Sequence, residues 1–469
     1  MNLSQKFPLA LIGAVATMAI AQPTPVLAIS ALEVGKATKS IAVFNLGSPI
    51  NRSLRLLASA QVDVGAKVPS ASVATEPKAE DFFIQGEEKY EKGDYQGAIQ
   101  AFNQAIKLNP NYTEAYGNRG IARYGLGDKQ GAVADFNEVL RINPNDAKAY
   151  LNRGVARDDL GDKQGAVGDY NQALRINPNY TEAYYNRGLA RYELGDKEGA
   201  VADYDQALQI NPNLAQGYYN RGVARYELGD KEGAVADYNQ ALRINPNDAN
   251  AYTNRGLARA DLGDKQGAVA DYNQALRINP NDANAYTNRG LARADLGDKQ
   301  GAVADFNQAL QINPNLAQAY NGRGVARRGL GDKQGAVADF NQALQINPNY
   351  ANAYNNRANA RSDLGDKQGA VADYNQALRI TPNLAIAYSN RGVARTKLGD
   401  KQGAVADFNQ ALRINPNLAG VYLNRGITRA DLGDKQGAIQ DFQKAADLFQ
   451  KQGDRDSYQK VLDHLRRLQ

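Results

Sequence analysis

A proline recurs every 34 residues through most of this chain of 469 residues. The ten prolines are Pro110, Pro144, Pro178, Pro212, Pro246, Pro280, Pro314, Pro348, Pro382 and Pro416. A fixed period of this length is typical of repeat architectures, in which each unit packs on its neighbours. It therefore predicts a stack of small units in place of the roughly three globular domains that the length alone would suggest.

When the proline is taken as position 32, residues 79–452 divide into eleven units of 34 residues. The units begin at Ala79, Thr113, Ala147, Thr181, Ala215, Ala249, Ala283, Ala317, Ala351, Ala385 and Ala419. Positions 4, 8 and 11, and again 20, 24 and 27, have the spacing of one helical face. The glycine at position 15 can close the first helix, and the aspartate at position 16 can cap the second. Each unit is therefore predicted to form a helix, a tight turn, a helix and a turn.

The unit at 249–282 carries a set of signature residues: Tyr252, Gly256, Ala258, Gly263, Asp264, Ala268, Tyr272, Ala275 and Pro280. With these residues it resembles the tetratricopeptide repeat (TPR), and the resemblance extends over residues 79–452. It implies an all-α fold, a right-handed TPR superhelical solenoid of helix-turn-helix repeats with a concave inner wall. Residues 453–469 are predicted to form a C-terminal capping helix, because solenoids need closed ends.

The N-terminal residues 1–28 are typical of a signal peptide. The apolar run from Leu9 to Ala21 is too short for a comfortable membrane span, and small residues allow cleavage after Ala21 or Ala28. We expect an exported protein with no integral membrane span after cleavage, in the periplasm or extracellular space, or in the thylakoid lumen of a photosynthetic source. The alternative is an uncleaved anchor or an apolar start that occurs by chance. Residues 29–78 are predicted to be a low-complexity linker, mostly disordered.

Composition argues against catalysis. The chain has no Cys, no Trp and a single histidine, His464, which we expect to be a plain surface residue. No Gly-rich phosphate loop and no pair of nucleophile and histidine is evident, so we expect no enzyme, no catalytic residue, no cofactor and no metal. Of the net charge of +5, residues 1–78 contribute +4 from seven basic and three acidic residues. The near-neutral array argues against nucleic-acid binding.

Two arginines and one aspartate occur together in ten units, at positions 7, 11 and 23. Examples are Arg255, Arg259 and Asp271. The first unit lacks all three and has Gln85, Lys89 and Ala101. This joint presence predicts structural ion pairs between packed helices, partly buried, although copying from one founder unit would produce the same pattern.

The TPR resemblance implies that positions 2, 5, 6, 9, 12 and 13 line the concave wall. Position 6 is asparagine in nine units: Asn118, Asn152, Asn186, Asn220, Asn254, Asn288, Asn356, Asn390 and Asn424. Amides can donate to and accept from the backbone of an extended peptide, so these residues are the candidate peptide-binding row. The alternative is that they form hydrogen bonds inside the array.

A second candidate patch combines aromatic and acidic residues in two successive units. It consists of Tyr185, Tyr192, Tyr219, Tyr226, Glu193 and Glu227. Rings beside carboxylates favour a partner with basic or aromatic side chains, although such charges are usually a solvated helix face.

These features together predict a non-catalytic protein–protein interaction scaffold that binds an extended peptide or a partner protein in the concave groove. The alternative is a regulatory or substrate-presenting arm of an enzyme complex, and an RNA-binding helical repeat is the least favoured. The oligomeric state is left open.

Overall fold

The computed structural model describes residues 77–468. The predicted signal peptide and nearly all of the predicted linker lie outside these residues. The described residues form two compact units, 77–263 and 264–468. All regular elements within them are helices, and no strand occurs between residues 77 and 468.

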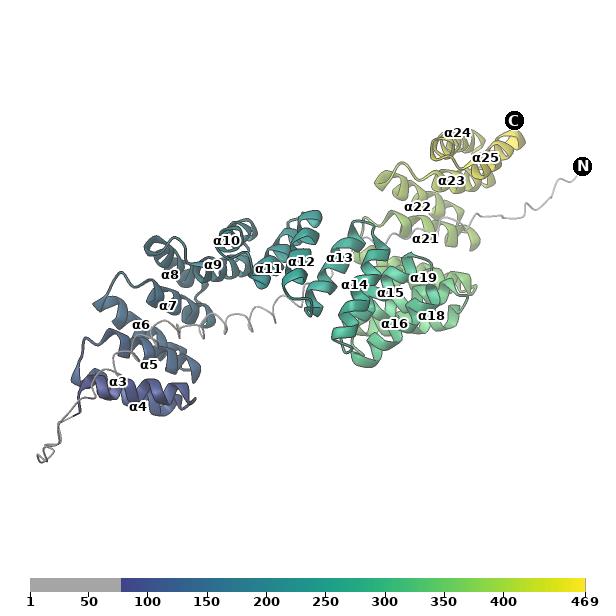
Figure 1. Ribbon diagram of the computed structural model, residues 1–469. Helices are drawn as coiled ribbons and strands as arrows, with labels where there is room; N and C mark the ends of the chain where they lie inside the picture. Colours follow the sequence, from purple (N-terminus) through teal and green to yellow (C-terminus); the bar gives the residue numbers. More distant parts are fainter. Residues whose placement is uncertain (1–76, 469) are drawn as a thin grey trace, which may run out of the picture. The chain divides into compact units, whose positions relative to one another are not determined.

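In the unit formed by residues 77–263, helices lie side by side in chain order (Figure 1). Their bounds are α3 (Ala79–Glu91), α4 (Tyr95–Leu108), α5 (Thr113–Gly125), α6 (Lys129–Ile142), α7 (Ala147–Asp159), α8 (Lys163–Ile176), α9 (Thr181–Glu193), α10 (Lys197–Ile210), α11 (Ala215–Glu227), α12 (Lys231–Ile244) and α13 (Ala249–Asp261).

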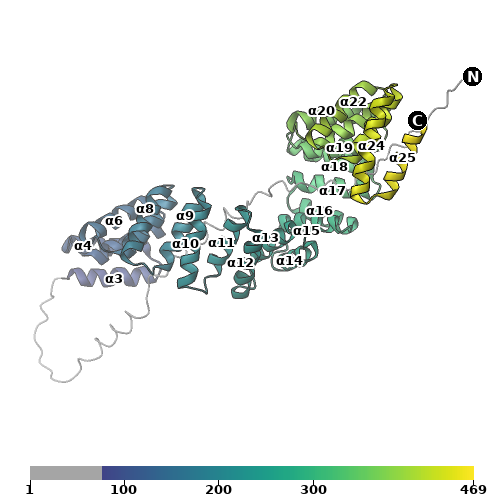
Figure 2. The same ribbon diagram turned by 90° about the horizontal axis from the view of Figure 1, so that it is seen from above.

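The unit formed by residues 264–468 continues the alternation and ends in an additional helix (Figure 2). Its helices are α14 (Lys265–Ile278), α15 (Ala283–Asp295), α16 (Lys299–Ile312), α17 (Ala317–Gly329), α18 (Lys333–Ile346), α19 (Ala351–Asp363), α20 (Lys367–Ile380), α21 (Ala385–Lys397), α22 (Lys401–Ile414), α23 (Ala419–Asp431), α24 (Lys435–Gln452) and α25 (Arg455–Leu468).

The turn inside each repeat follows the predicted chemistry. The glycine at position 15 has φ between 79° and 94° in all eleven repeats, a backbone that costs glycine no steric penalty. The aspartate at position 16 then accepts a hydrogen bond from the N–H at position 19 at 2.8–2.9 Å, as Asp162 does from Gly165. Each second helix therefore begins with a satisfied N-cap.

Small residues and one aromatic ring form the core of each repeat. In the repeat at 147–180, Tyr170 is 1% exposed and lies between the buried Ala166 and Ala173. A Cβ added to Gly154 would lie 2.6 Å from the Tyr170 ring, so only glycine fits where α7 approaches α8. Glycine at this position thus allows the two helices of the repeat to pack closely.

Both ends of the array differ from its interior. The first repeat has exposed Asp81 and Glu88 where the next repeat has the fully buried Ala115 and Ala122. At the other end α25 packs on α24, with Val461 fully buried, which confirms the predicted capping helix.

Candidate functional site

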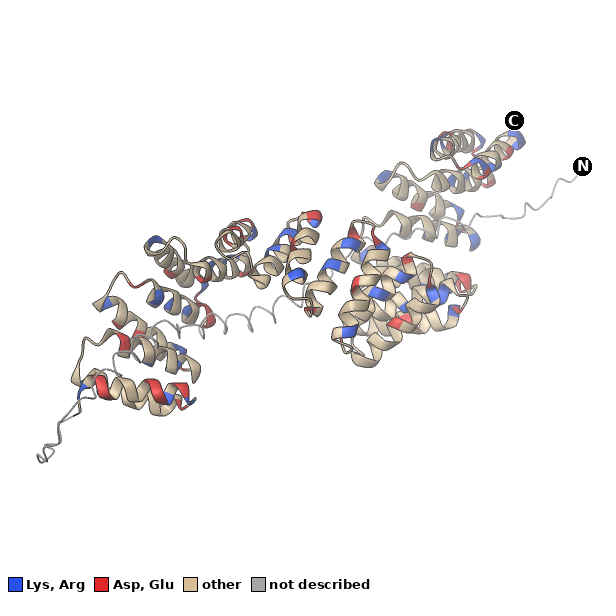
Figure 3. Cartoon of the chain, in the orientation of Figure 1, with Lys and Arg blue, Asp and Glu red and all other residues tan. Residues whose placement is uncertain are grey.

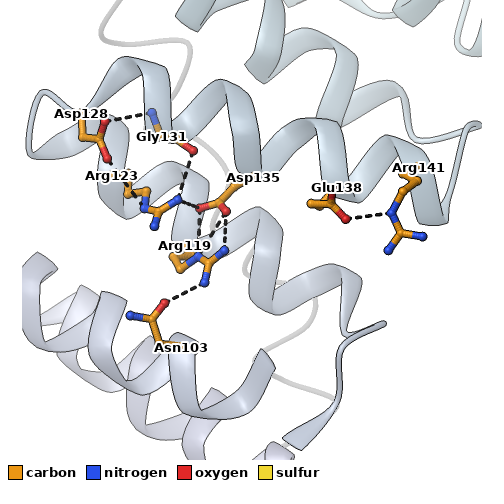
Figure 4. A network of polar contacts seen from close by, with 8 residues as sticks. All are labelled: Asn103, Arg119, Arg123, Asp128, Gly131, Asp135, Glu138 and Arg141. Carbon is orange, nitrogen blue, oxygen red and sulfur yellow. Dashed lines mark hydrogen bonds and ion pairs between the residues drawn. The ribbon is translucent and has the colours of Figure 1, made fainter. Parts of the chain in front are cut away.

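The two arginines and the aspartate of each repeat form a partly buried ion cluster between its two helices (Figure 4). In the repeat at 113–146, Arg119 Nη2 lies 2.5 Å from Asp135 Oδ1, and its Nε donates to Asp135 Oδ2 at 3.0 Å. Arg123 Nη1 donates to the same Oδ2, also at 3.0 Å. The carboxylate side chain is only 2% exposed, whereas the side chains of Arg119 and Arg123 are 14% and 26% exposed. One buried carboxylate is thus held by two arginines from the facing helix.

The same arrangement is present in nine repeats, including the one at 113–146. The distance from the position 7 arginine to the aspartate is 2.5–2.6 Å, and that from the position 11 arginine is 2.9–3.0 Å. The example named from sequence, Arg255, Arg259 and Asp271, lies on α13 and α14, on either side of the boundary between the two compact units. Asp271 is 2% exposed, and the pairing in that repeat stays a prediction.

The position 7 arginine also joins each repeat to the one before it. Arg153 Nη1 donates to Asn137 Oδ1 at 2.7 Å, and its guanidinium lies 5.3 Å from the centre of the Tyr150 ring. We call the contact between two successive repeats a seam. In ten repeats the arginine makes this hydrogen bond across the seam, to position 25 of the preceding repeat, and lies over the tyrosine at position 4. The arginine is therefore a seam residue as well as a member of the ion cluster.

Sequence reasoning missed the acceptor at position 25, although a signal was present. Asparagine stands there in nine of the ten units that precede an arginine-bearing unit, and Asp205 stands in the tenth. The last unit, which no repeat follows, has Gln443. The acceptor thus occurs wherever the next repeat supplies the donor.

The nine predicted peptide-binding asparagines fall into two groups. Five are half-buried, and each donates its Nδ2 to the preceding repeat at 3.0–3.4 Å: Asn118, Asn220, Asn254, Asn356 and Asn390. Four are buried, with exposed fractions of 2–7%: Asn152, Asn186, Asn288 and Asn424.

The buried group requires a correction to the predicted row. Bulky neighbours at position 5, such as Leu151 and Leu423, are themselves only 1–2% exposed. Asn152, Asn186, Asn288 and Asn424 are therefore not accessible to a peptide on this surface. Both amide atoms of Asn186 and the Oδ1 of Asn152 lack a protein hydrogen-bond partner, which is costly for buried polar groups.

The four predicted tyrosines also divide. Tyr185 and Tyr219 are 6% and 1% exposed and pack in the cores of their repeats, so their assignment to an exposed patch is wrong. Their position 5 places the rings against Tyr204 and Tyr238, at centroid distances of 6.0 Å. Packing against the second helix of the same repeat thus contributes to the burial of both rings.

Tyr192 and Tyr226 are half-buried and bond to acids of the following repeat. The Tyr226 hydroxyl donates to Asp261 Oδ2 at 2.7 Å. Burial raises the pKa of Tyr192, and the hydrogen bond to Glu227 raises it further. Burial and the hydrogen bond to Asp261 raise the pKa of Tyr226 in the same way. Both hydroxyls therefore stay protonated and act as donors across a seam.

The predicted acids at position 13 are also paired across seams. Glu193 forms an ion pair with Lys163, and Glu227 Oε2 lies 3.0 Å from Lys197 Nζ. These lysines stand at position 17 of the preceding repeat. The carboxylates are therefore neutralised within the array and do not form a bare acidic wall.

His464 differs from the expectation of a plain surface residue. Its ring stacks on Phe442 at 5.3 Å, and burial together with Arg467 lowers its pKa. Among residues 77–468 no cluster of three His, Cys, Asp or Glu side chains has the arrangement of a metal site. None of the described helices has the length and apolarity needed to cross a membrane.

Family models of the tetratricopeptide repeat match residues 113–146, 283–316, 317–350, 340–372, 385–418 and 419–452. A further TPR repeat model matches residues 86–127, 158–195, 188–229, 224–263, 258–297 and 358–399. The matches thus cover most of the array that the 34-residue period defined.

A curated relative is an uncharacterized protein of Methanocaldococcus jannaschii, 44% identical over 45 residues, which are 10% of this chain and 52% of that protein. This chain therefore spans about half the length of the curated relative it matches. Similar solved structures include MamA, at 28% identity over 34% of this chain and 93% of that chain, with a TM-score of 0.33. YrrB, described as a TPR protein with an unusual peptide-binding site, is 23% identical over 39% of this chain and 95% of its own, with a TM-score of 0.36. Yeast Tom70 is 17% identical over 83% of this chain and 95% of its own, with a TM-score of 0.40.

Proposed function

The chain belongs to the tetratricopeptide-repeat family and is a protein-interaction scaffold. We propose that it binds an extended segment of a partner protein along the surface formed by the first helix of each repeat. TPR proteins bind protein or peptide partners, and this general role needs no chemistry from the scaffold itself. The finer proposal concerns which side chains grip the partner.

The observation that carries the proposal is the half-buried group of asparagines. Asn220 Nδ2 donates to the Tyr185 hydroxyl at 3.0 Å, and Asn254 Nδ2 donates to the Tyr219 hydroxyl at the same distance. A primary amide has two N–H donors and one acceptor oxygen, and no other protein bond to these two amides occurs among residues 77–468. Each amide is thus oriented by the neighbouring repeat and retains one N–H and its carbonyl oxygen. Those are the two groups that a peptide backbone needs.

We also propose that the scaffold acts outside the cytoplasm. The support for this is the apolar run from Leu9 to Ala21, followed by small residues. Fractionation of the source cells, with sequencing of the N-terminus of the mature protein, tests this part independently of binding.

The binding test compares two sets of five substitutions. One variant changes the half-buried asparagines to alanine: Asn118, Asn220, Asn254, Asn356 and Asn390. The matched control changes five exposed turn asparagines to alanine: Asn111, Asn213, Asn247, Asn349 and Asn383. The probe is an immobilised set of synthetic twelve-residue peptides of varied sequence, which the wild-type chain is screened against.

We expect the wild-type protein to retain a subset of the peptides. The first variant should lose about tenfold or more in affinity for them, as the loss of several backbone hydrogen bonds implies, and the control should bind as the wild type does. Equal binding by the two variants would refute the proposal.

A further inference from the structure

The seams of the unit at 77–263 are electrically neutral along one edge. There, from the second repeat on, the lysine at position 17 of one repeat faces an acid at position 13 of the next; the first seam has the uncharged Tyr95 and Gly125 at these positions. The pairs are Lys129–Asp159, Lys163–Glu193, Lys197–Glu227 and Lys231–Asp261. In the other unit, Lys265–Asp295 and Lys401–Asp431 follow the same rule at 2.9 and 3.1 Å.

Between those last two pairs the rule breaks at three successive seams. Position 13 is Gly329 at the first, and Lys299 Nζ donates to its backbone oxygen at 3.1 Å instead of to a carboxylate. At the second seam the carboxylate of Asp363 is taken by Arg328 at 2.7 Å, which leaves Lys333 only the backbone oxygen of Asp363 at 3.2 Å.

At the third seam Lys397 stands where the acid would be, after Lys367. We name the five cations of these seams the basic edge: Lys299, Arg328, Lys333, Lys367 and Lys397. Asp363 is the one acid at the same positions, so the edge has a net charge of +4 within an array that is nearly neutral.

The other acids near the basic edge also occur at the neutral seams, so they do not offset its additional positive charge. The capping aspartates at position 16, such as Asp332 and Asp366, occur at every seam and lie 3.8 Å from the position 11 arginines. Because these aspartates occur in both units, they do not change the difference in charge between the basic edge and the other seams. Basic and acidic residues are otherwise distributed over both units (Figure 3).

Apolar side chains lie beside these cations. Val325 is 44% exposed, although the equivalent Val155, Leu189 and Val223 are buried. On α17, Gly322, Val325 and Gly329 follow the i, i+3, i+7 spacing and share one face. A Cβ on Gly322 would lie 2.5 Å from the fully buried Phe306 ring, so glycine lets α17 pack closely on the preceding repeat. The absence of side chains at two of these three positions leaves Val325 uncovered.

Exposed leucines extend this apolar surface along the edge. Leu330, Leu364 and Leu398 at position 14 are 44–47% exposed, each next in sequence to position 13. Equivalent leucines in the other unit adjoin neutral seams. The combination of several unneutralised cations with exposed aliphatic groups is therefore particular to residues 299–398.

We infer that the basic edge binds an acidic segment of a partner protein in which carboxylates alternate with aliphatic side chains. The inference rests on the proposed scaffold function and specifies one partner chemistry. Carboxylates would pair with the lysines, and aliphatic groups would cover Val325 and the leucines. Aliphatic neighbours favour a polypeptide over a nucleic acid, because base stacking needs aromatic rings, and positions 12 and 13 of these repeats have none.

The test measures fluorescence anisotropy with a labelled peptide that alternates Glu or Asp with Leu or Val. One variant carries Lys299→Gln, Lys333→Gln and Lys367→Gln. The matched control carries Lys163→Gln, Lys197→Gln and Lys231→Gln, the same change at the same repeat position in the neutral seams. A peptide with lysine in place of each acid and an oligothymidine of equal charge are the comparison probes, and circular dichroism checks that both variants remain helical.

We expect the acidic peptide to bind the wild-type chain, to bind the first variant about tenfold more weakly, and to bind the control within about twofold of wild type. The lysine peptide should not bind the edge. Three results would overturn the inference: no binding of the acidic peptide at low salt, equal losses in the two variants, or tighter binding of oligothymidine. If the edge variant binds normally while the five-alanine variant loses its peptides, the scaffold proposal stands and only the basic edge is refuted.

Discussion

Replacing Asp203 by alanine tests the ion cluster most directly. Asp203 Oδ1 lies 2.5 Å from Arg187 Nη2, and its Oδ2 accepts from Arg187 Nε and Arg191 Nη1, both at 2.9 Å. The aspartate side chain is 3% exposed, and the two arginine side chains are 15% and 27% exposed. The substitution leaves two guanidinium groups without their carboxylate between α9 and α10.

The expected cost follows from this geometry. Removing one partner of a fully buried pair costs about 3–5 kcal/mol, because the other charge is left buried. Here both arginines reach solvent, and Arg187 retains its bond to Asn171 at 2.6 Å, so we expect the low end, about 3 kcal/mol. Since about 1.4 kcal/mol corresponds to a factor of ten, amides of α9 and α10 should exchange roughly 150-fold faster.

Native-state hydrogen exchange is the suitable assay, since repeat arrays open locally and a single melting temperature averages over them. The control is Glu198→Ala, an exposed acid on the same α10, which should change local stability by less than about 0.5 kcal/mol. Unchanged exchange in the Asp203 variant would show that the cluster was copied from a founder unit without stabilising its repeat.

Four further substitutions have expected outcomes. Gly168→Ala should stabilise α8 by about 1 kcal/mol in denaturant titrations, because an added Cβ there meets no atom within 4 Å. Gly322→Asn should instead destabilise the local repeat by about 1–3 kcal/mol, since the Phe306 ring cannot move aside, and wild-type exchange rates would contradict this. Asn186→Leu should raise the protection of α9 by about 1–3 kcal/mol, because it removes a buried amide with no partner, and a loss of protection would show that the amide is satisfied. The pKa of His464 is lowered, so its contribution to stability is complete above the unfolded value of about 6.5 and is lost as pH falls through the folded pKa. The protection of α25 amides, measured relative to their intrinsic exchange rates at each pH, should therefore fall at acid pH more in the wild type than in His464→Phe.

The sequence was sufficient for the parts of the fold that depend on local chemistry. Gly161 and Asp162 end one helix and begin the next as their residue types require, and the proline period set the repeat length. The pairing of arginines with aspartate was also foreseeable, because the three residues occur or are missing together. Each of these signals lies within one unit of 34 residues.

Features that depend on the neighbouring repeat were harder to foresee. The rings of Tyr185 and Tyr219 pack on their own repeats, and their hydroxyls accept hydrogen bonds from the next repeat, from Asn220 and Asn254. Asn186 is buried, whereas Asn220 is half-buried, although both stand at position 6. Residue type and period do not determine this difference. Asn220 donates to the Tyr185 hydroxyl of the preceding repeat, whereas Asn186 has Leu151 at the equivalent place and no hydrogen-bond partner.

The seam bond from arginine to position 25 has a consequence for how such a chain can change length. Every interior module carries a donor for the module before it and an acceptor for the module after it, as Arg289 and Asn307 do within residues 283–316. Unequal recombination that adds or deletes one whole module would therefore still place a donor arginine beside a position 25 acceptor at the new junction. The modules at 249–282 and 283–316, which differ at only three residues, are what a recent event of this kind would leave. Array length can thus vary between descendants while the chemistry of every junction stays the same.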